Sequence, residues 1–300
     1  MSVVGIDLGG TKIAAGVFSE KALRSKVTVP TPEDGGEAVV EAMAQAARAA
    51  MREAGMVVRS VGLGVPGPLD FKEGIIKFAP NIAGMLNFPV VAKLTAALGL
   101  PVYLENDANA AALAEHHLGA AQGAESSLFV TVSTGIGGGF VMGGRVWRGA
   151  HGQGAEVGHV TVMPQGPVCG CGLDGCLESV AAGRALERDA GYAYNTPMPT
   201  PELFARYRAG ETKAVRIVRQ AAHFVGLGLA NFVKTFDPEV IVIGGGVALH
   251  GGEGYMEALR QAYQNYLEGW QPAPIRLARL GTEAGLLGAA LTAALEVGEV

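Results

Sequence analysis

The chain has 300 residues and a net charge of −5, and 49% of its residues are hydrophobic, 17% charged and 6% aromatic. This composition predicts a folded protein with an aliphatic core, large enough for one large domain or two moderate ones. The acidic balance and the lack of a long basic run argue against a nucleic-acid partner. The apolar stretches are too short to span a bilayer, and Asp7 comes too early for a signal peptide. We therefore expect a cytoplasmic protein with no membrane partner.

The first part of the chain alternates predicted strands with predicted helices. Two apolar strands, at 3–6 and 13–18, flank a glycine turn. Apolar spacing and terminating glycines or prolines then indicate, in chain order, a helix at 37–55, a strand at 61–65, a helix at 90–98, a strand at 101–104 and an alanine-rich helix at 107–118.

The strand, glycine turn and strand pattern then returns, with strands expected at 127–133 and 140–147 around the turn 134–139. The remaining predicted elements are a helix at 213–235, strands at 240–243 and near 275–280, and helices at about 254–268 and 284–300.

This alternation predicts an α/β fold. The repeated pattern predicts two related lobes, a small one at 1–115 and a large one at 116–283, with the last helix packing back on the first lobe. The cleft between two such lobes is a natural small-molecule site.

Two glycine turns are candidates for phosphate binding. IDLGGTK lacks the Lys-Ser/Thr order of a Walker A loop, and a strand follows STGIGGG where a Rossmann fingerprint opens a helix. Backbone N–H groups of a glycine turn can still bind an anion. Thr11 and Thr134 add hydroxyl groups, and Asp7 could hold Mg²⁺ directly or through water. The alternative is two ordinary hairpins, with Lys12 solvated or salt-bridged.

The stretch LENDANAAALAE places Glu105, Asn106 and Asp107 where a strand ends and a helix begins. Asn and Asp are good helix N-caps, so a capping role is one interpretation. Ligand sites of α/β sheets lie at the carboxyl ends of strands. Asp107 could therefore accept a hydroxyl proton from a substrate while phosphate is transferred to that substrate.

The chain holds three cysteines, all in one glycine-rich loop, at Cys169, Cys171 and Cys176. With His159 they form a Cys₃His set, which is common in structural zinc sites. The alternative is three buried reduced cysteines and a core histidine. Glu156 and Glu178 flank the candidate ligands, so a bound metal would fix two carboxylates that can accept hydrogen bonds from vicinal sugar hydroxyls.

Together these motifs resemble the bacterial ROK family of repressors and sugar kinases, which belongs to the actin-like ATPase superfamily. The resemblance covers essentially the whole chain and rests on IDLGGTK, VPGP, LENDANAAALAE, VSTGIGGG, GAEVGHVTV, CGCGLDGCLES and VIVIGGGVA. It implies a two-lobed, ribonuclease H-like fold with a duplicated strand–turn–strand core and a zinc-bound loop. It also implies an ATP-dependent sugar kinase, most similar to the glucokinase members.

The resemblance also assigns roles to residues. Asp107 matches the base that activates the sugar hydroxyl, which is the 6-hydroxyl in the glucokinase members. Sugar-binding positions match Gly67, Asn81, Asn106, Asp107, Glu156, His159 and Glu178. Positions that bind ATP and its Mg²⁺ match Asp7, Gly9, Gly10, Thr11, Lys12, Thr134, Gly135 and Gly245. The structural zinc ligands match His159, Cys169, Cys171 and Cys176.

Alternatives remain for the sugar substrate and for the class of protein. APNIAGM resembles a glucokinase sequence that has an aromatic residue where Met85 stands, and Asn81 could simply cap a loop. The same chemistry on fructose, mannose, allose, N-acetylmannosamine or N-acetylglucosamine is therefore the alternative. A repressor is disfavoured because the first strand begins by residue 3, and a non-catalytic sugar sensor because Asp107 is present. The family usually forms oligomers, so we expect a homodimer or homotetramer.

Overall fold

The computed structural model describes residues 2–79 and 81–298. Pro80 of the APNIAGM motif and the last two residues of the expected C-terminal helix lie outside the described residues. The chain divides into two compact units. The first unit consists of Met1–Gly123, Gly139–Gly154 and Arg279–Val300, and the second of Ala124–Gly138 and Ala155–Ala278. This division differs from the expected lobes chiefly at 139–154, which returns to the first unit.

The first unit is built on a twisted sheet whose strand order is β3-β2-β1-β5-β8, with β4 also paired to β2. β1 runs antiparallel to β2 and parallel to β5, and β5 runs parallel to β8. The strands are β1 (Ser2–Leu8), β2 (Lys12–Ser19), β3 (Ala22–Leu23), β4 (Val27–Pro30), β5 (Val58–Val65) and β8 (Val102–Asn106). The four expected strands are confirmed, and the sequence analysis missed only the short strands β3 and β4 of this sheet.

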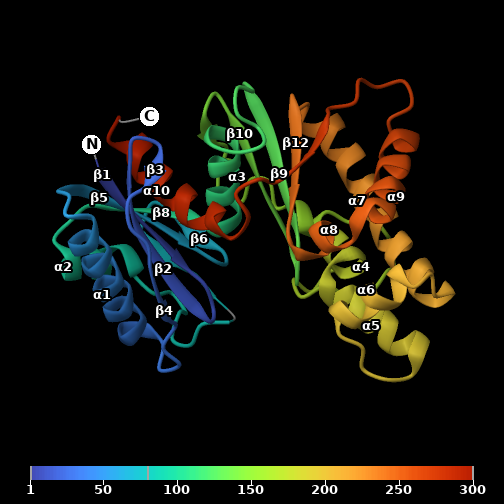
Figure 1. Ribbon diagram of the computed structural model, residues 1–300, viewed down its shortest axis with the longest axis horizontal. Coiled ribbons are helices and arrows are strands. Elements are labelled where there is room, and N and C mark those ends of the chain that lie inside the picture. Colours follow the sequence, from blue (N-terminus) through green and yellow to red (C-terminus); the bar gives the residue numbers. More distant parts are fainter. Residues whose placement is uncertain (1, 80, 299–300) are drawn as a thin grey trace. The chain divides into compact units, whose positions relative to one another are not determined.

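Helices cover both faces of this sheet (Figure 1). They are α1 (Gly36–Ala54), α2 (Val90–Leu98), α3 (Asp107–His117) and α10 (Ala284–Glu296). Because side chains alternate along a strand, Val4, Ile6 and Leu8 enter the core that includes the apolar face of α1. Gly5 and Asp7 face the opposite way, toward α10. The last helix thus packs on the sheet that opens the chain.

Helix α10 comes very close to its neighbours because glycines stand at the contacts. A Cβ atom on Gly62 of β5 would overlap the Ala289 carbonyl, and one on Gly288 would overlap the Ala110 carbonyl of α3. The Thr292 hydroxyl donates a hydrogen bond to the Gly288 carbonyl at 3.0 Å. The sheet, α3 and α10 are therefore packed closely against one another in the first unit.

Two small hairpins complete the first unit. One is β6 (Leu69–Asp70) with β7 (Ile75–Ile76), and the other joins the end of β10 (Ile136–Met142) to β11 (Arg145–Val146). The expected strand at 140–147 was wrong at both ends, because β10 begins inside the expected glycine turn and ends at Met142, before the turn that leads to β11. Gly139 lies in this strand, and α3 packs closely on it, since a Cβ on Gly139 would lie 2.7 Å from the Ala112 Cβ.

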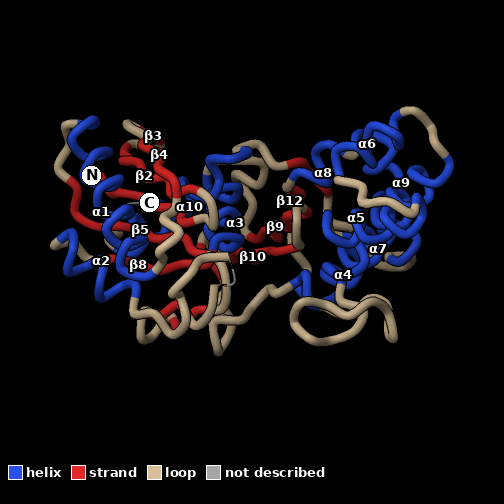
Figure 2. The backbone as a smooth tube through the Cα atoms, turned by 90° about the horizontal axis from the view of Figure 1, so that it is seen from below, coloured by secondary structure: helices blue, strands red, loops and turns tan. Residues whose placement is uncertain are grey.

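In the second unit, the start of β10 lies next to β9, which is followed by β12 and β13 in the sheet. These strands are β9 (Ser126–Val132), β12 (Val240–Gly244) and β13 (Ile275–Leu277). Figure 2 shows the helices of this unit and the long loop that enters α4. The helices are α4 (Leu177–Ala181), α5 (Gly183–Tyr194), α6 (Thr200–Arg208), α7 (Thr212–Phe236), α8 (Gly246–His250) and α9 (Gly252–Tyr266). The expected helices in α7 and α9 are confirmed, and α4, α5, α6 and α8 were missed.

Among the described residues, no helix combines the length and the apolar character that crossing a membrane requires.

Candidate active site

The first unit gathers candidate residues at one edge of its sheet. β1, β5 and β8 are parallel, so their carboxyl ends meet at the same edge. Asp7 pairs in register with Gly64, and Val65 with Asn106. The end of β1, the loop after β5 and the end of β8 therefore lie side by side at this edge.

The first glycine turn is exposed at this edge. Gly9 donates its N–H to the Lys12 carbonyl at 3.0 Å, and the Thr31 hydroxyl donates to the Gly9 carbonyl at 2.7 Å. Gly10, Thr11 and Lys12 are exposed. These hydrogen bonds hold both sides of the turn, and its tip stays open to an anion.

Two predicted sugar positions lie next to this turn or to the loop after β5. Gly10 packs against Asn81, since a Cβ on Gly10 would lie 3.0 Å from the Asn81 Cβ. Gly67 has a φ of 93° and packs against the Phe78 carbonyl. Asn81 itself is exposed, whereas Met85 is 2% exposed and belongs to the core of this unit.

Asp7 is a partly buried carboxylate at the end of β1. Burial raises its pKa above the ordinary value, and the charges of Lys12 and Lys26 oppose that shift. A Cβ on Gly285, at the start of α10, would lie 2.8 Å from Asp7 Oδ2. A partly buried carboxylate beside a glycine turn is a suitable ligand for Mg²⁺.

The capping and ligand-binding interpretations of Asn106 are compatible. Its Oδ1 accepts hydrogen bonds from the backbone N–H groups of Ala108 and Asn109 at 2.9 and 3.2 Å, so this oxygen caps α3. The Nδ2 group of Asn106 is the other end of the amide and can donate to a ligand. Asp107 is the first residue of α3 and is exposed, with Oδ1 accepting from the Ala108 N–H at 2.8 Å.

The second unit brings the four predicted zinc ligands together. One ligand atom from each of His159, Cys169, Cys171 and Cys176 lies within 4.8 Å of all the others. His159 Nδ1 is 3.6 Å from Cys169 Sγ, and Cys171 Sγ is 3.6 Å from Cys176 Sγ. Zinc–sulfur bonds of about 2.3 Å in a tetrahedron require sulfur atoms about 3.8 Å apart. The donor set and its spacing therefore fit a zinc ion.

The backbone of the cysteine loop holds these side chains in place. Cys169 donates its N–H to the Leu173 carbonyl at 2.8 Å, and Gly172 donates back to the Cys169 carbonyl at 2.9 Å. Burial raises the pKa of Cys169 and raises that of Cys176 to about 12. A hydrogen bond from the Leu173 backbone lowers the pKa of Cys171.

The two flanking carboxylates are arranged around this cluster. Glu178 lies in the first turn of α4, and its Oε2 accepts the Ile136 N–H at 2.8 Å while its Oε1 is 4.0 Å from Cys169 Sγ. Partial burial raises the pKa of Glu156. The positive charge of His159 opposes this shift, and the negative charge of Glu178 adds to it. His159 turns Nδ1 toward the sulfur atoms, so Nε2 is the nitrogen left for a ligand.

The second glycine turn also gathers its predicted residues. Gly245 has a φ of 90° and packs against the Val132 backbone, directly before Ser133. The Ser133 carbonyl accepts the Gly183 N–H at 2.7 Å, so the start of α5 supports the turn. Thr134 is exposed at its tip. The candidate residues Thr134, Gly135 and Gly245 therefore lie close together.

The predicted residues thus form one group in each unit. The first unit holds Asp7, Gly9, Gly10, Thr11, Lys12, Gly67, Asn81, Asn106 and Asp107, and the second holds Thr134, Gly135, Glu156, His159, Glu178, Gly245 and the cysteines. The backbone of Ile136 and the side chain of Arg148 were not among the predicted site residues. Glu105 was noted beside Asn106 in the motif but was given no role, although its carboxylate accepts the Asn106 N–H.

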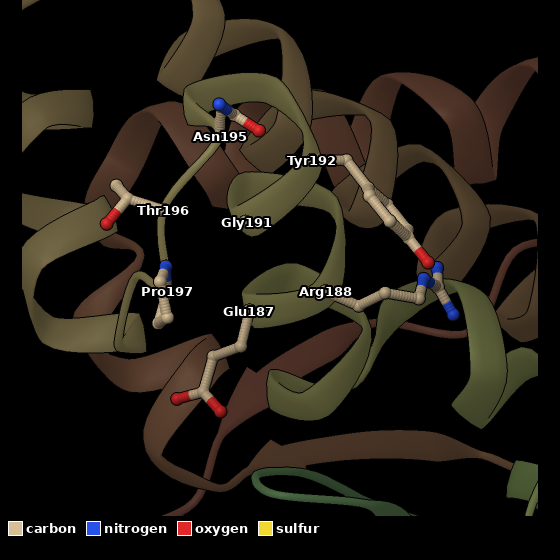
Figure 3. A pocket seen from close by; sticks show the side chains of 7 residues that line it. All are labelled: Glu187, Arg188, Gly191, Tyr192, Asn195, Thr196 and Pro197. Carbon is tan, nitrogen blue, oxygen red and sulfur yellow. The ribbon is translucent and has the colours of Figure 1, made fainter.

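A separate surface hollow of about 370 Å³ lies at the end of α5 (Figure 3). It is lined by Glu187, Arg188, Gly191, Tyr192, Asn195, Thr196 and Pro197, none of which is a predicted site residue. Glu187 accepts two hydrogen bonds from Thr200 at the start of α6, and Arg188 donates to Asp189 and to the Ser179 carbonyl. The charged side chains of this hollow therefore hold helices together.

Comparison with known proteins decides the family. The ROK family model matches residues 3–295. The chain belongs to the ROK family. A ROK hexokinase from Thermus thermophilus with a solved structure is 65% identical, with a TM-score of 0.96 and all of both chains covered. A ROK family glucokinase from Streptomyces griseus, solved with glucose and AMPPNP, is 38% identical, with a TM-score of 0.83 and 98% of this chain and 100% of that chain covered.

A third relative is named as a kinase of a sugar other than glucose. N-acetylmannosamine kinase from Citrobacter koseri is 37% identical over 98% of this chain and 99% of its own length. Its sequence identity to this chain is nearly the same as that of the Streptomyces griseus glucokinase. Sequence identities of 37% and 38% therefore support a ROK sugar kinase but do not distinguish glucose from N-acetylmannosamine as the substrate.

Proposed function

We propose that this ROK protein is an ATP-dependent hexose kinase whose preferred substrate is glucose, phosphorylated at the 6-hydroxyl. The observation that carries the proposal is the exposed carboxylate of Asp107 at the start of α3, next to the amide of Asn106. A carboxylate in this place can take a proton from a substrate hydroxyl. The hexokinase that is 65% identical over its whole length supports the same activity.

In the proposed reaction, Asp107 accepts the proton of the sugar hydroxyl. The hydroxyl oxygen forms a bond to the γ-phosphorus of ATP while the bond from that phosphorus to the β-phosphate oxygen breaks. The products are the sugar phosphate and ADP, and the proton remains on Asp107 until solvent removes it. Asp107 needs no strong basicity, because such transfer depends mainly on positioning and on stabilising the phosphoryl charge.

Polar side chains at the predicted sugar-binding positions are assigned to the sugar hydroxyls. Asn106 donates through Nδ2, since its Oδ1 already caps α3. His159 offers Nε2, while Glu156 and Glu178 accept from hydroxyls. Carboxylates fixed in this way reject sugars that lack a hydroxyl at the matching position, because an acceptor covered by the bound sugar then has no partner. Gly67 and Asn81 complete the proposed sugar-binding set.

The two glycine turns are assigned to ATP. Thr11 with Gly9, Gly10 and Lys12, and Thr134 with Gly135 and Gly245, offer N–H groups, hydroxyls and one positive charge for phosphate oxygens. Asp7 is the proposed protein ligand of Mg²⁺, directly or through water, and Mg²⁺ supplies charge neutralisation at the phosphates.

We further propose that His159, Cys169, Cys171 and Cys176 hold a structural zinc ion. The fit of the four donors supports this, because three sulfur atoms and one nitrogen lie within 4.8 Å of one another. The ion has no part in the transfer. Bound there, it would hold Cys176 and one nitrogen of His159 in place, and with Cys176 the start of α4, where Glu178 lies. A homodimer or homotetramer stays a prediction.

N-acetylmannosamine is the second candidate substrate, because a kinase for that sugar is 37% identical to this chain. Met85, at a position that is aromatic in glucokinases, is buried in the core and does not by itself select the sugar. A coupled assay of ADP release, run against a panel of hexoses and N-acetylhexosamines, tests the proposal. The highest kcat/KM on glucose supports it, and the highest value on an N-acetylhexosamine replaces glucose as the substrate.

A further inference from the structure

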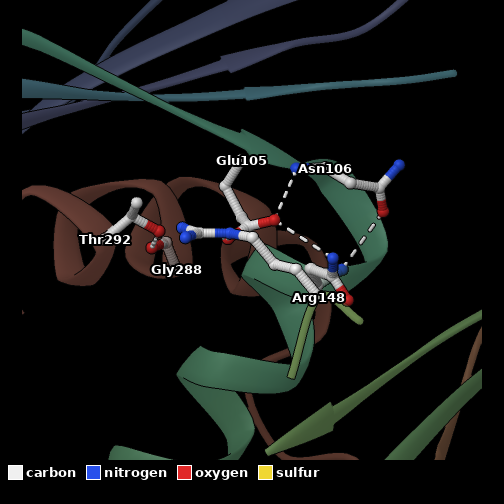
Figure 4. A network of polar contacts seen from close by, with 6 residues as sticks. Glu105, Asn106, Arg148, Gly288 and Thr292 are labelled. Carbon is white, nitrogen blue, oxygen red and sulfur yellow. Dashed lines mark hydrogen bonds and ion pairs between the residues drawn. The ribbon is translucent and has the colours of Figure 1, made fainter. Parts of the chain in front are cut away.

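An ion pair lies directly behind the Asn106–Asp107 corner. Glu105, the residue before Asn106 in β8, is 0% exposed. Its Oε2 accepts hydrogen bonds from Nε and Nη2 of Arg148, both at 2.8 Å. Figure 4 shows the Arg148 guanidinium reaching Glu105 beside Asn106. The proposed reaction and the predicted site residues make no use of this pair.

The other oxygen of Glu105 holds the corner itself. Glu105 Oε1 accepts the backbone N–H of Asn106 at 2.9 Å and the side-chain amide of Asn109 at 3.0 Å. Asn109 also donates its backbone N–H to Asn106 Oδ1 at 3.2 Å. Glu105 therefore fixes the last residue of β8 and the first turn of α3, and Asp107 lies between these two contacts.

A buried carboxylate of this kind depends on its cation. Removing one partner of a buried ion pair leaves an uncompensated charge, and the remaining group then rearranges or takes up a proton. The Glu105 carboxylate makes only one ion pair among the described residues, with Arg148. Loss of Arg148 would therefore act on the Asn106–Asp107 corner through Glu105.

Arg148 is in turn held by its own surroundings. Its guanidinium lies over the Phe71 ring, 5.0 Å from the ring centre, where a cation is favoured. The Arg148 carbonyl accepts the Gly154 N–H at 2.8 Å, and Gly152 packs on the same Phe71 ring. The loop from Arg148 to Gly154 is thus closed on itself, and Glu156 follows two residues after it.

We propose that Glu105 and Arg148 are positioning residues for Asp107. Their ion pair sets the orientation of the Asn106–Asp107 corner, and the Arg148 backbone anchors the loop that leads to Glu156. Neither side chain needs to touch a substrate for this role. The inference rests on the proposed function, because Asp107 must be the base for its orientation to control turnover.

The test is a double-mutant cycle with Arg148→Met, Glu105→Gln and the double variant. Misplacing a base by about 1 Å can cost about 100-fold in rate, so each single variant is expected to lower kcat about 10- to 100-fold. The KM for the hexose and for ATP should change far less than kcat. Because both residues act through one contact, the double variant should be about as slow as the slower single variant. Arg148→Lys should restore only part of kcat, since it cannot donate in the paired geometry.

The exposed pair Arg260 and Glu253 of α9 is the matched control, with Arg260 Nη1 2.7 Å from Glu253 Oε1. Its Met and Gln variants should leave kcat unchanged. If Arg148→Met does not fold, Glu105→Gln alone decides, because Gln keeps the shape of the side chain and an acceptor oxygen. Unchanged kcat in a folded variant, additive losses, or a loss confined to KM overturns the inference. A wild-type protein that turns over no hexose instead overturns the proposed function.

Discussion

The carboxylate of Glu178 accepts a hydrogen bond from the backbone N–H of Ile136 at 2.8 Å. Glu178 follows the last cysteine by two residues, whereas Ile136 is the first residue of β10 and directly follows Thr134 and Gly135. A Cβ on Gly135 would overlap Glu178 Oε2, so the two segments are in close contact. A residue assigned to the sugar therefore also fixes the turn assigned to phosphate.

Two substitutions separate these roles of Glu178. Glu178→Gln keeps an acceptor oxygen for the Ile136 N–H but removes the charge, so we expect the KM for the hexose to rise about 10- to 100-fold with little change in the KM for ATP. Glu178→Ala also leaves the Ile136 N–H without its acceptor, so both KM values should rise. Steady-state kinetics with each substrate varied in turn measure this, and equal effects of the two variants on ATP would contradict it.

Zinc should be present in the purified protein at about one ion per chain. Cys171→Ala removes one of four ligands, so we expect the metal to be lost and the KM for the hexose to rise by at least about tenfold, because the loop that leads into α4 and Glu178 loosens. Elemental analysis gives the metal content independently of activity. Asp174→Asn, in the same loop but outside the four-ligand set, is the control and should keep the metal. A wild-type protein without zinc would refute the assignment.

The ionised Asp7 carboxylate should lower the stability of the folded protein at neutral pH, because burial raises the pKa of this group in the folded state. The folded state then binds the proton more tightly than the unfolded state, and its stability falls as the pH rises through the ordinary value of 3.8 and up to the raised value. Asp7→Asn should therefore raise the melting temperature by a few degrees at pH 7, while lowering kinase activity. This gain should vanish well below pH 3.8, where Asp7 is protonated in both states.

The exposed Asp34 provides the comparison for Asp7. Asp34→Asn should leave the melting temperature unchanged across the same pH range. Thermal unfolding followed by circular dichroism at several pH values measures both variants. A lower melting temperature for Asp7→Asn at pH 7 would show that the Asp7 carboxylate stabilises the fold.

The close packing of α10 on α3 gives a prediction for stability. Gly288→Ala places a Cβ against the Ala110 carbonyl, so we expect the free energy of unfolding to fall by about 1–3 kcal/mol. Gly191→Ala in α5 is the matched substitution, because the nearest atom, the Thr196 carbonyl oxygen, would be 3.7 Å away. There the gain in helix propensity should raise the free energy of unfolding by about 0.5–1 kcal/mol. Urea unfolding distinguishes the two, and equal effects would contradict the close approach.

Local motifs explain why much of the site could be predicted from the sequence. Asn106 and Asp107 are adjacent, and the three cysteines lie within eight residues, so their proximity required no knowledge of the fold. The strands were also predictable, because β-branched runs such as 240–243 end at glycine. Parallel pairing of β1, β5 and β8 then follows from the βα alternation.

Contacts between distant segments could not be predicted in this way. Arg148 and Glu105 are 43 residues apart, and neither residue type nor spacing indicates that they meet. The glycines of β10 suggested a turn, but α3 packs so closely on this strand that only small residues fit there. Helix α4 is only five residues long, and α5 and α6 bury few large apolar side chains, so none of the three shows a sustained helical spacing in the sequence.

The central claim is that Asp107 is the base for phosphate transfer to a hexose. Asp107→Asn keeps the size of the side chain and an acceptor for the Ala108 N–H, so sugar binding should survive. The decisive measurement is kcat for Asp107→Asn alongside its dissociation constant for glucose from isothermal titration calorimetry. We predict a fall in kcat of about 10²- to 10⁴-fold with glucose affinity close to that of the wild type. Near-normal turnover in this variant would contradict the account.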